Sequence, residues 1–314
     1  MRARDHGGGL DAAVARWGGA RGDWLDLSTG INPVPYPLPP LPAEAWERLP
    51  DRGVQAALEE AARAFWRVPE GAEVVAAPGL SALIARLPEV LGLGRVAIPG
   101  PTYNEHAAAF RAAGATVLDD ARPFEPLVAV HPNNPDGRTW PALALDGRPL
   151  AVVDESFCDP TPALSHVART TRPGTVVLKS FGKFWGLAGL RLGFALLAPG
   201  PAAERLREAL GPWPVSGPAL AVGAAALRDE AWAEGARARL AADSARLDAL
   251  LAARGARLVG GTALFRLYEV DEAEAWAERL AMARVLARAF PYCATWLRLG
   301  LPAPGAWGRL EAAL

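Results

Sequence analysis

Lys179 and Lys183 are the only two lysines among the 314 residues, and they lie in a stretch rich in glycine and small polar side chains. A lysine amine can form a Schiff base with an aldehyde, which few other side chains do. The apolar residues 175–178 predict a buried strand, so Lys183 is expected in the loop after it. In open α/β sheets, ligands bind beyond the carboxyl ends of strands. This stretch therefore predicts carbonyl chemistry at one edge of a sheet.

The segment 180–193, SFGKFWGLAGLRLG, resembles the pyridoxal-phosphate attachment site of class I/II aminotransferases. The resemblance implies that Lys183 carries the Schiff base with pyridoxal 5'-phosphate, while Ser180 and Arg191 hold the cofactor phosphate. A P-loop is excluded, because it needs a glycine five residues before Gly-Lys and the residue there is Val177. The same resemblance implies an enzyme of fold type I.

Strand-like and helix-like segments alternate through most of the chain, which predicts a doubly wound, mostly parallel sheet. The expected strands are 73–77, 95–98, 115–118, 127–130, 150–153, 175–178 and 194–198. Residues 218–254 are helical in pattern, with a break around Asp229. The tail adds a strand-like segment at 262–270, a helix near 272–289 and a strand at 295–299.

These elements predict an α/β protein of the PLP-dependent transferase fold type I. Its large PLP-binding domain is expected at 44–215. A smaller α/β domain at 216–314 is joined by the N-terminal arm 1–43, which is rich in Gly and Pro. Residues 10–17 of the arm can form a short helix, and the rest reads as extended chain outside the core.

Further loop positions fit the same cofactor. Gly79, Leu80 and Ser81 lie between an expected strand and a helix start, where backbone N–H groups and the helix dipole favour a phosphate. An aromatic ring such as Tyr103 at a helix start packs or stacks, and the resemblance implies that it stacks on the cofactor ring. The resemblance also implies that Asn134, in an Asn-Pro turn, hydrogen-bonds the cofactor's phenolic oxygen.

Asp154 follows the apolar strand 150–153, and a buried carboxylate there is unfavourable without a partner. A protonated pyridine nitrogen is such a partner and keeps the ring able to accept electrons. The predicted catalytic residues are Lys183, Asp154 and Tyr103. Phe157 stands where many aminotransferases have Tyr, and Leu49 stands where many have a Tyr that reaches the other subunit.

The amino-terminal arm resembles that of the threonine-phosphate decarboxylases of cobalamin biosynthesis. The matching segments are 6–8, 24–28, 31–33 and 101–106. Members of that family convert L-threonine O-3-phosphate into (R)-1-amino-2-propanol O-2-phosphate and carbon dioxide. The resemblance implies an amino-acid phosphate as substrate, with Arg298 binding the carboxylate and His6, Ser28 and Asn32 as candidates for the phosphate. An arginine suits a carboxylate because its planar fork binds both oxygens.

Two other functions remain open from the sequence. A histidinol-phosphate type of aminotransferase shares nearly all these cofactor motifs, and a non-catalytic fold type I relative would only bind a ligand. The net charge of −1 without a basic block argues against nucleic-acid binding, and no apolar run is long enough for a membrane. Cys158 and Cys293 have no metal-binding spacing. We expect a cytoplasmic homodimer, the latter by family analogy.

Overall fold

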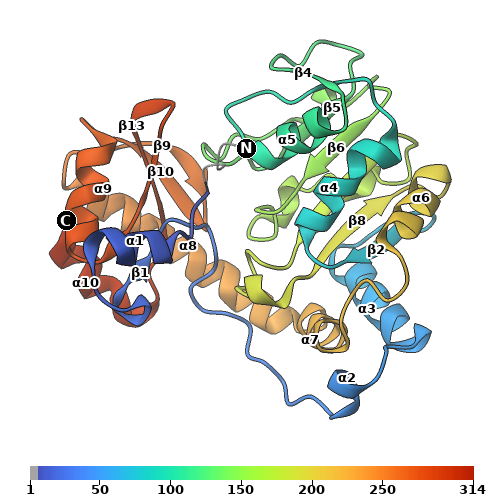
Figure 1. Ribbon diagram of the computed structural model, residues 1–314, viewed down its shortest axis with the longest axis horizontal. Helices are drawn as coiled ribbons and strands as arrows, with labels where there is room; N and C mark the ends of the chain where they lie inside the picture. The colour runs from blue at the N-terminus through green and yellow to red at the C-terminus, as the bar shows by residue number, and fades with distance from the viewer. Residues whose placement is uncertain (1–5) are drawn as a thin grey trace. The chain divides into compact units, whose positions relative to one another are not determined.

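The computed structural model describes residues 6–314, whose larger compact unit comprises residues 35–134 and 138–234. Its seven-stranded sheet has the order β2-β8-β7-β6-β5-β3-β4 (Figure 1). The strands are β2 (Glu73–Ala77), β3 (Arg95–Ala97), β4 (Thr116–Leu118), β5 (Leu127–Val130), β6 (Ala151–Asp154), β7 (Thr175–Ser180) and β8 (Gly193–Leu197).

The pairing registers show that every strand of this sheet except β8 runs in the same direction. Strands β5 to β8 are almost continuously buried along their length. Continuous burial is expected of a largely parallel sheet whose two faces are both covered. The prediction of an α/β protein with a mostly parallel sheet is confirmed.

Helix α4 (Leu80–Leu91) packs against β2, β7 and β8. Figure 1 shows α5 (Asn104–Ala112) and α6 (Pro201–Leu210) beside it on the same side of the sheet. Leu83, Leu87 and Phe110 from this layer are at most 1% exposed. Helices α3 and α7 pack against each other. The helices of this unit are α2 (Glu44–Glu47), α3 (Arg52–Phe65), α4 (Leu80–Leu91), α5 (Asn104–Ala112), α6 (Pro201–Leu210) and α7 (Gly217–Leu227). Its 3₁₀ turns are η2 (Ala142–Ala144), η3 (Pro162–Leu164), η4 (Val167–Arg169) and η5 (Ala188–Leu190).

The smaller unit comprises residues 6–34, 135–137 and 235–314. Its antiparallel sheet has the order β12-β13-β10-β9, and a separate parallel pair joins β1 to β11. The strands are β1 (Leu25–Asp26), β9 (Arg257–Thr262), β10 (Phe265–Glu269), β11 (Val285–Leu286), β12 (Arg288–Phe290) and β13 (Cys293–Gly300). The helices are α1 (Leu10–Trp17), α8 (Glu230–Ala252), α9 (Ala273–Met282) and α10 (Trp307–Ala313), with 3₁₀ turns η1 (Arg21–Asp23) and η6 (Pro304–Ala306). Residues 230–234 of α8 belong to the larger unit.

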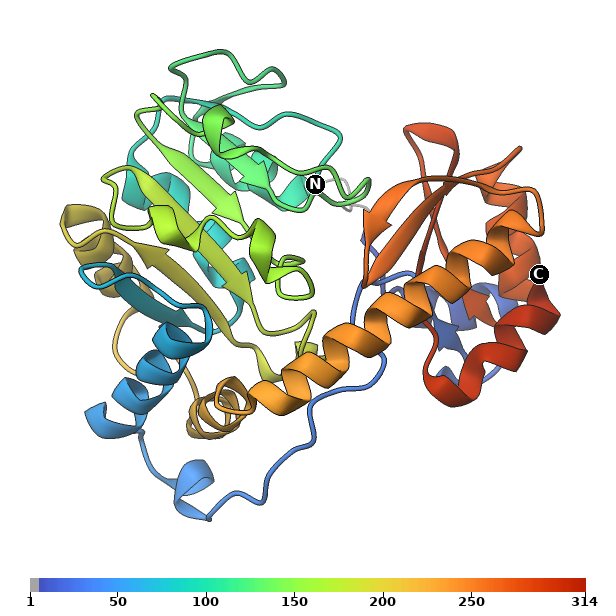
Figure 2. The ribbon, with the colours of Figure 1, turned by 180° about the vertical axis from the view of Figure 1, so that it is seen from behind.

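Helix α8 lies along the small sheet, as Figure 2 shows, and is tied to β10 through Asp248. The Asp248 carboxylate accepts hydrogen bonds from Arg266 at 2.7 and 2.9 Å and from the Tyr268 hydroxyl at 2.8 Å. Helix α9 packs against β11, β12 and β13. The helical break expected near Asp229 separates α7 from α8.

The short helix expected at residues 10–17 is confirmed as α1, whereas the expectation that the arm lies outside the core is wrong. Trp24 and Leu27 are 7% and 1% exposed, β1 pairs with β11, and α1 packs against α9. A two-residue strand surrounded by Gly and Pro has no periodicity to reveal it. The boundaries between the units lie at residues 34 and 234, whereas the sequence predicts them at 43 and 215. The second boundary is later because residues 216–227 pack on α3 within the larger unit.

The carboxy-terminal elements also differ from the sequence expectation. The segment 262–270 belongs to a hairpin of β9 and β10, and the helix expected near 272–289 ends at Met282, before β11 and β12. Both errors are boundary errors, because short antiparallel strands joined by tight turns carry little periodic signal.

Candidate active site

One cavity of about 220 Å³ lies in the larger unit, where β6 and β7 end and α4 begins. All nine residues expected from the sequence to bind the cofactor line this cavity: Gly79, Leu80, Ser81, Tyr103, Asn134, Asp154, Ser180, Lys183 and Arg191. They come from six separate segments of the chain. The fold therefore brings the candidates together, and their individual roles toward the cofactor stay predictions.

The turn before α4 has the form of an anion cradle. Gly79 has φ +86°, and a Cβ there would lie 2.7 Å from the Arg191 guanidinium, so the backbone and the arginine approach closely. Arg191 itself is in the left-handed region, with φ 54°, and its guanidinium donates to the Ala188 carbonyl at 3.1 Å. The first N–H groups of an α-helix lack partners within the helix. Helix start, arginine and the Ser180 hydroxyl thus suit a phosphate group.

Asp154 ends β6 and is 1% exposed. Its Oδ2 lies 2.8 Å from His106 Nε2, and its Oδ1 accepts from the Ser156 hydroxyl at 2.6 Å and the Ser156 N–H at 3.0 Å. Burial alone would raise the pKa of Asp154, but the contacts with His106 and Ser156 lower it below its ordinary value. A carboxylate held ionised in a buried cavity suits a cationic ring nitrogen.

Lys183 and two aromatic rings line the same cavity. The Lys183 Nζ lies 5.5 Å from the centre of the Phe157 ring, and Tyr103 makes an edge contact with His106 at 6.1 Å between ring centres. An amine, an anionic carboxylate, an aromatic ring and a phosphate cradle around one cavity fit pyridoxal phosphate in each of its chemical parts.

Asn133 is a residue that the sequence interpretation missed. Its side chain is fully buried, donates to the Pro101 carbonyl at 3.0 Å, and accepts from the Thr102 hydroxyl at 2.5 Å. These bonds join the turn before Asn134 to the turn before Tyr103. The Asn-Asn doublet was the available signal. The local sequence does not show which asparagine faces the cavity and which joins the two turns.

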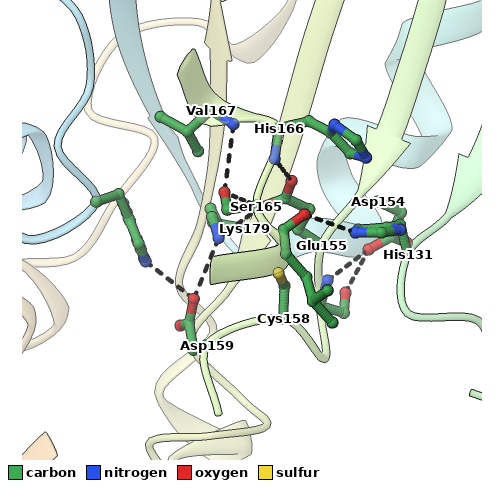
Figure 3. Close-up of polar contacts among 12 residues, drawn as sticks. His131, Asp154, Glu155, Cys158, Asp159, Ser165, His166, Val167 and Lys179 are labelled. Carbon is green, nitrogen blue, oxygen red and sulfur yellow. Dashed lines mark hydrogen bonds and ion pairs between the residues drawn. The ribbon is translucent and has the colours of Figure 1, made fainter. Parts of the chain in front are cut away.

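The second lysine of the chain has a different environment. Figure 3 shows the Lys179 ammonium between two carboxylates, 2.7 Å from Glu155 Oε2 and 3.2 Å from Asp159 Oδ1. Burial alone would lower the pKa of Lys179, but both carboxylates raise it above its ordinary value. Lys179 is 1% exposed and does not line the cavity, so it is held as a cation and is a poor amine nucleophile.

The expected substrate residues Arg298, Ser28, Asn32 and His6 all belong to the smaller unit. Arg298 is 4% exposed, donates to the Ser28 carbonyl at 2.5 Å, and lies 5.1 Å over the Phe265 ring. The His6-Gly7-Gly8 segment reaches Ser28, since the Gly8 N–H donates to the Ser28 hydroxyl at 2.7 Å. His6 is exposed.

Two of these side chains have structural partners that the sequence interpretation did not foresee. The Ser28 hydroxyl donates to Asp26 at 2.6 Å, and the Asn32 carbonyl oxygen accepts from Arg239 at 2.7 Å and the Val34 N–H at 3.0 Å. A hydroxyl has one proton to donate, and here Asp26 receives it. Ser28 therefore anchors the arm in this conformation, and Asn32 is held by Arg239 and by the backbone of Val34.

Arg288 is a further candidate, found only from the sheet register. It lies directly opposite Arg298 across β12 and β13, so both side chains project from the same face. Like charges directly opposite each other on a sheet repel, and an anion placed between two guanidinium groups reduces that repulsion. A substrate with two anionic groups fits such a pair.

The described chain, residues 6–314, contains no helix long and apolar enough to cross a membrane. Within the same residues, no cluster of three or more His, Cys, Asp or Glu side chains could hold a metal ion.

The sequence profile of the family described as aminotransferase class I and II matches residues 116–313. A threonine-phosphate decarboxylase of Sinorhizobium sp is 44% identical, over 98% of this chain and 97% of that protein. One of Pseudomonas aeruginosa is 43% identical, over 99% and 97%. The solved structure of histidinol-phosphate aminotransferase from Sinorhizobium meliloti with pyridoxal-5'-phosphate has a TM-score of 0.80 at 18% identity, covering 100% of this chain and 98% of that one.

Proposed function

This chain belongs to the aminotransferase class I and II family and is a pyridoxal-phosphate-dependent enzyme, and we propose that it decarboxylates L-threonine O-3-phosphate. The product would be (R)-1-amino-2-propanol O-2-phosphate, the linker precursor of cobalamin. The observation that carries the proposal is the cavity that gathers Lys183, Asp154 and the Arg191 cradle. The choice of reaction rests on two relatives of that name, similar over nearly the whole chain.

When bound, pyridoxal phosphate supplies an electron sink for the pair released at the substrate Cα. The residues of the chain bind and orient it. Lys183 would hold its carbonyl carbon, and the Lys183 amine would deliver a proton to the substrate Cα. Asp154 keeps the ring nitrogen protonated, and Ser180, Arg191 and the start of α4 hold the phosphate.

The substrate carries a carboxylate and a phosphate, and we assign these to the arginines of the smaller unit. Arg298 binds the carboxylate through its planar fork, and Arg288, His6 and the Asn32 amide bind the phosphate. In decarboxylation the Cα–carboxylate bond breaks, carbon dioxide leaves, and a proton takes its place at Cα. Binding of the distant phosphate orients the bond that breaks.

A histidinol-phosphate type of aminotransferase is the second candidate, because that group shares nearly all the cofactor motifs found in this chain. The two reactions differ in product. The loaded enzyme should release carbon dioxide from L-threonine O-3-phosphate without a keto-acid acceptor. Amino transfer from histidinol phosphate to 2-oxoglutarate, with no carbon dioxide from threonine phosphate, would assign the chain to the aminotransferases.

We also infer a homodimer. Large apolar side chains are exposed around α2 of the larger unit: Leu38, Trp46, Leu49 and Val54 are 67%, 70%, 69% and 42% exposed. Leu49 and Val54 line a hollow of about 280 Å³. Exposed apolar groups of this kind mark interaction surfaces, and a second copy of the chain is the partner that the family suggests. Light scattering should give twice the chain mass, and Trp46→Glu should shift it toward the monomer.

A further inference from the structure

Residues 155–159 form a segment, here called the carboxylate turn, that has neither helical nor strand structure. It follows Asp154 directly and carries Ser156 and Phe157 to the cavity. Its backbone link to β7 is the bond from the Glu155 N–H to the Leu178 carbonyl at 2.9 Å. Within and after the turn, the Cys158 N–H donates to the Glu155 carbonyl at 3.1 Å and the Thr161 N–H donates to the Cys158 carbonyl at 2.8 Å. Side-chain contacts add the links to more distant parts of the unit.

Lys179 holds the carboxylate turn on both sides of Phe157. Its ammonium binds Glu155 at 2.7 Å and Asp159 at 3.2 Å, which are the first and last residues of the turn. Lys179 is also the residue that precedes Ser180 and lies four residues before Lys183. One side chain therefore connects the turn after Asp154 with the strand end that leads to Lys183.

The other contacts of the two carboxylates complete the cluster. Glu155 accepts from the Ser165 hydroxyl at 2.6 Å and the His166 N–H at 2.5 Å, and Asp159 accepts from the Trp66 indole at 3.0 Å. Burial alone would raise the pKa of Glu155, but Lys179 lowers it below its ordinary value; burial raises the pKa of Asp159. Removing one partner from a buried ion cluster leaves an uncompensated charge, which is strongly unfavourable.

We propose that Lys179 is a positioning residue whose buried ammonium fixes the carboxylate turn and so sets Asp154 and Phe157 against Lys183. The inference rests on the proposed roles of Asp154 and Lys183. It assigns no chemistry to Lys179, which touches neither the cavity nor a reacting atom.

Cys158 gives a direct probe of the turn. It lies between Glu155 and Asp159, is fully buried, and burial raises the pKa of its thiol above the ordinary value. In a Cys293→Ser background, Cys158 is the single thiol of the chain. Its reaction with a thiol reagent, measured in the cofactor-free protein, reports opening of the turn independently of catalysis.

Lys179→Met should speed labelling of Cys158 by about ten- to a hundredfold, the factor for a buried polar group left without its partner. Lys179→Arg, which keeps the charge, should restore much of the protection. Arg148→Met is the matched control: Arg148 holds four backbone carbonyls in the same unit, at Ala121, Arg122, Glu125 and Ala144, none of which lines the cavity. It should destabilise the unit without exposing Cys158 to the same degree.

The second measurement is the visible absorbance of the bound cofactor as a function of pH. Lys179→Met should shift the pH midpoint of the absorbance change, because it moves Asp154 relative to Lys183. Arg148→Met should leave this midpoint unchanged. If Lys179→Met does not fold, Asp159→Asn, which keeps the Glu155 pair, takes its place with smaller effects of the same kind. A protected Cys158 and an unchanged midpoint in the folded variant would overturn the proposal. Such a result would leave the decarboxylase assignment intact, since product analysis tests that separately.

Discussion

His106 Nε2 lies 2.8 Å from Asp154 Oδ2, and both residues are 1% exposed. The pair joins the first turn of α5 to the end of β6, and the two residues are 48 positions apart along the chain. Tyr103 stands one turn before His106, so the ring that lines the cavity and the partner of Asp154 share one helix start. The carboxylate is thus oriented as well as ionised.

Asp154→Asn should keep the fold and lose most activity. A neutral amide no longer favours a protonated ring nitrogen, and each pKa unit lost there is about 1.4 kcal/mol. Turnover and thermal unfolding should be measured together on the loaded variant. His106→Gln should have a smaller effect in the same direction. Near wild-type turnover of Asp154→Asn with cofactor bound would exclude the role assigned to this carboxylate.

Lys183→Ala should abolish turnover and prevent borohydride from fixing the cofactor to the chain. Peptide mapping of the reduced wild-type enzyme should place the label on Lys183. Lys179→Ala is not a neutral control, because it would leave Glu155 and Asp159 without their cation. If peptide mapping instead found the reduced cofactor on Lys179, the result would contradict the site described above.

Arg298→Lys should lower kcat/KM by about ten- to a hundredfold, the range for a lost hydrogen bond to a charged group. Lysine keeps the charge but not the planar fork. Arg288→Lys should act on phosphorylated substrates and spare unphosphorylated L-threonine. If Arg288→Lys impairs both substrates equally, Arg288 does not read the phosphate.

His6→Ala tests the arm at an exposed residue and leaves the Ser28 and Asn32 contacts in place. We expect kcat/KM for L-threonine O-3-phosphate to fall by about tenfold, while cofactor absorbance and turnover of L-threonine stay unchanged. Asn32→Ala is a less clean variant, since it also removes the acceptor of Arg239. Equal losses with both substrates would mean that the arm is structural.

Burial lowers the pKa of His131 from its ordinary 6.5, and its ring donates to the Leu164 carbonyl while accepting from the Trp140 N–H. The unfolded chain therefore takes up this proton at a higher pH than the folded chain. Stability from His131 is complete above about pH 6.5 and is lost progressively as the pH falls toward the folded pKa. The difference in unfolding free energy between wild type and His131→Gln should shrink over that window. A pH-independent difference would show that His131 does not titrate this way.

The sequence alone was enough to identify the cofactor and the fold class. The attachment motif around Lys183 and the turn at Gly79 to Ser81 are local, with contacts that depend on spacing along a few residues. Asp154 could be found the same way, because an ionisable residue at the end of an apolar strand is conspicuous. In such short segments, residues a few positions apart are also close in space, so the sequence predicts their contacts.

Only the tertiary structure decided the partners across long sequence separations. The pairing of Asp154 with His106, the enclosure of Lys179 by Glu155 and Asp159, and the position of Arg288 opposite Arg298 depend on strand order and register. The hydrogen bond from the Ser28 hydroxyl to Asp26 joins residues two positions apart, yet no sequence pattern distinguishes this hydroxyl from an exposed one. Periodicity gives the face on which a side chain stands, whereas its neighbours follow from which elements the folded sheet brings side by side.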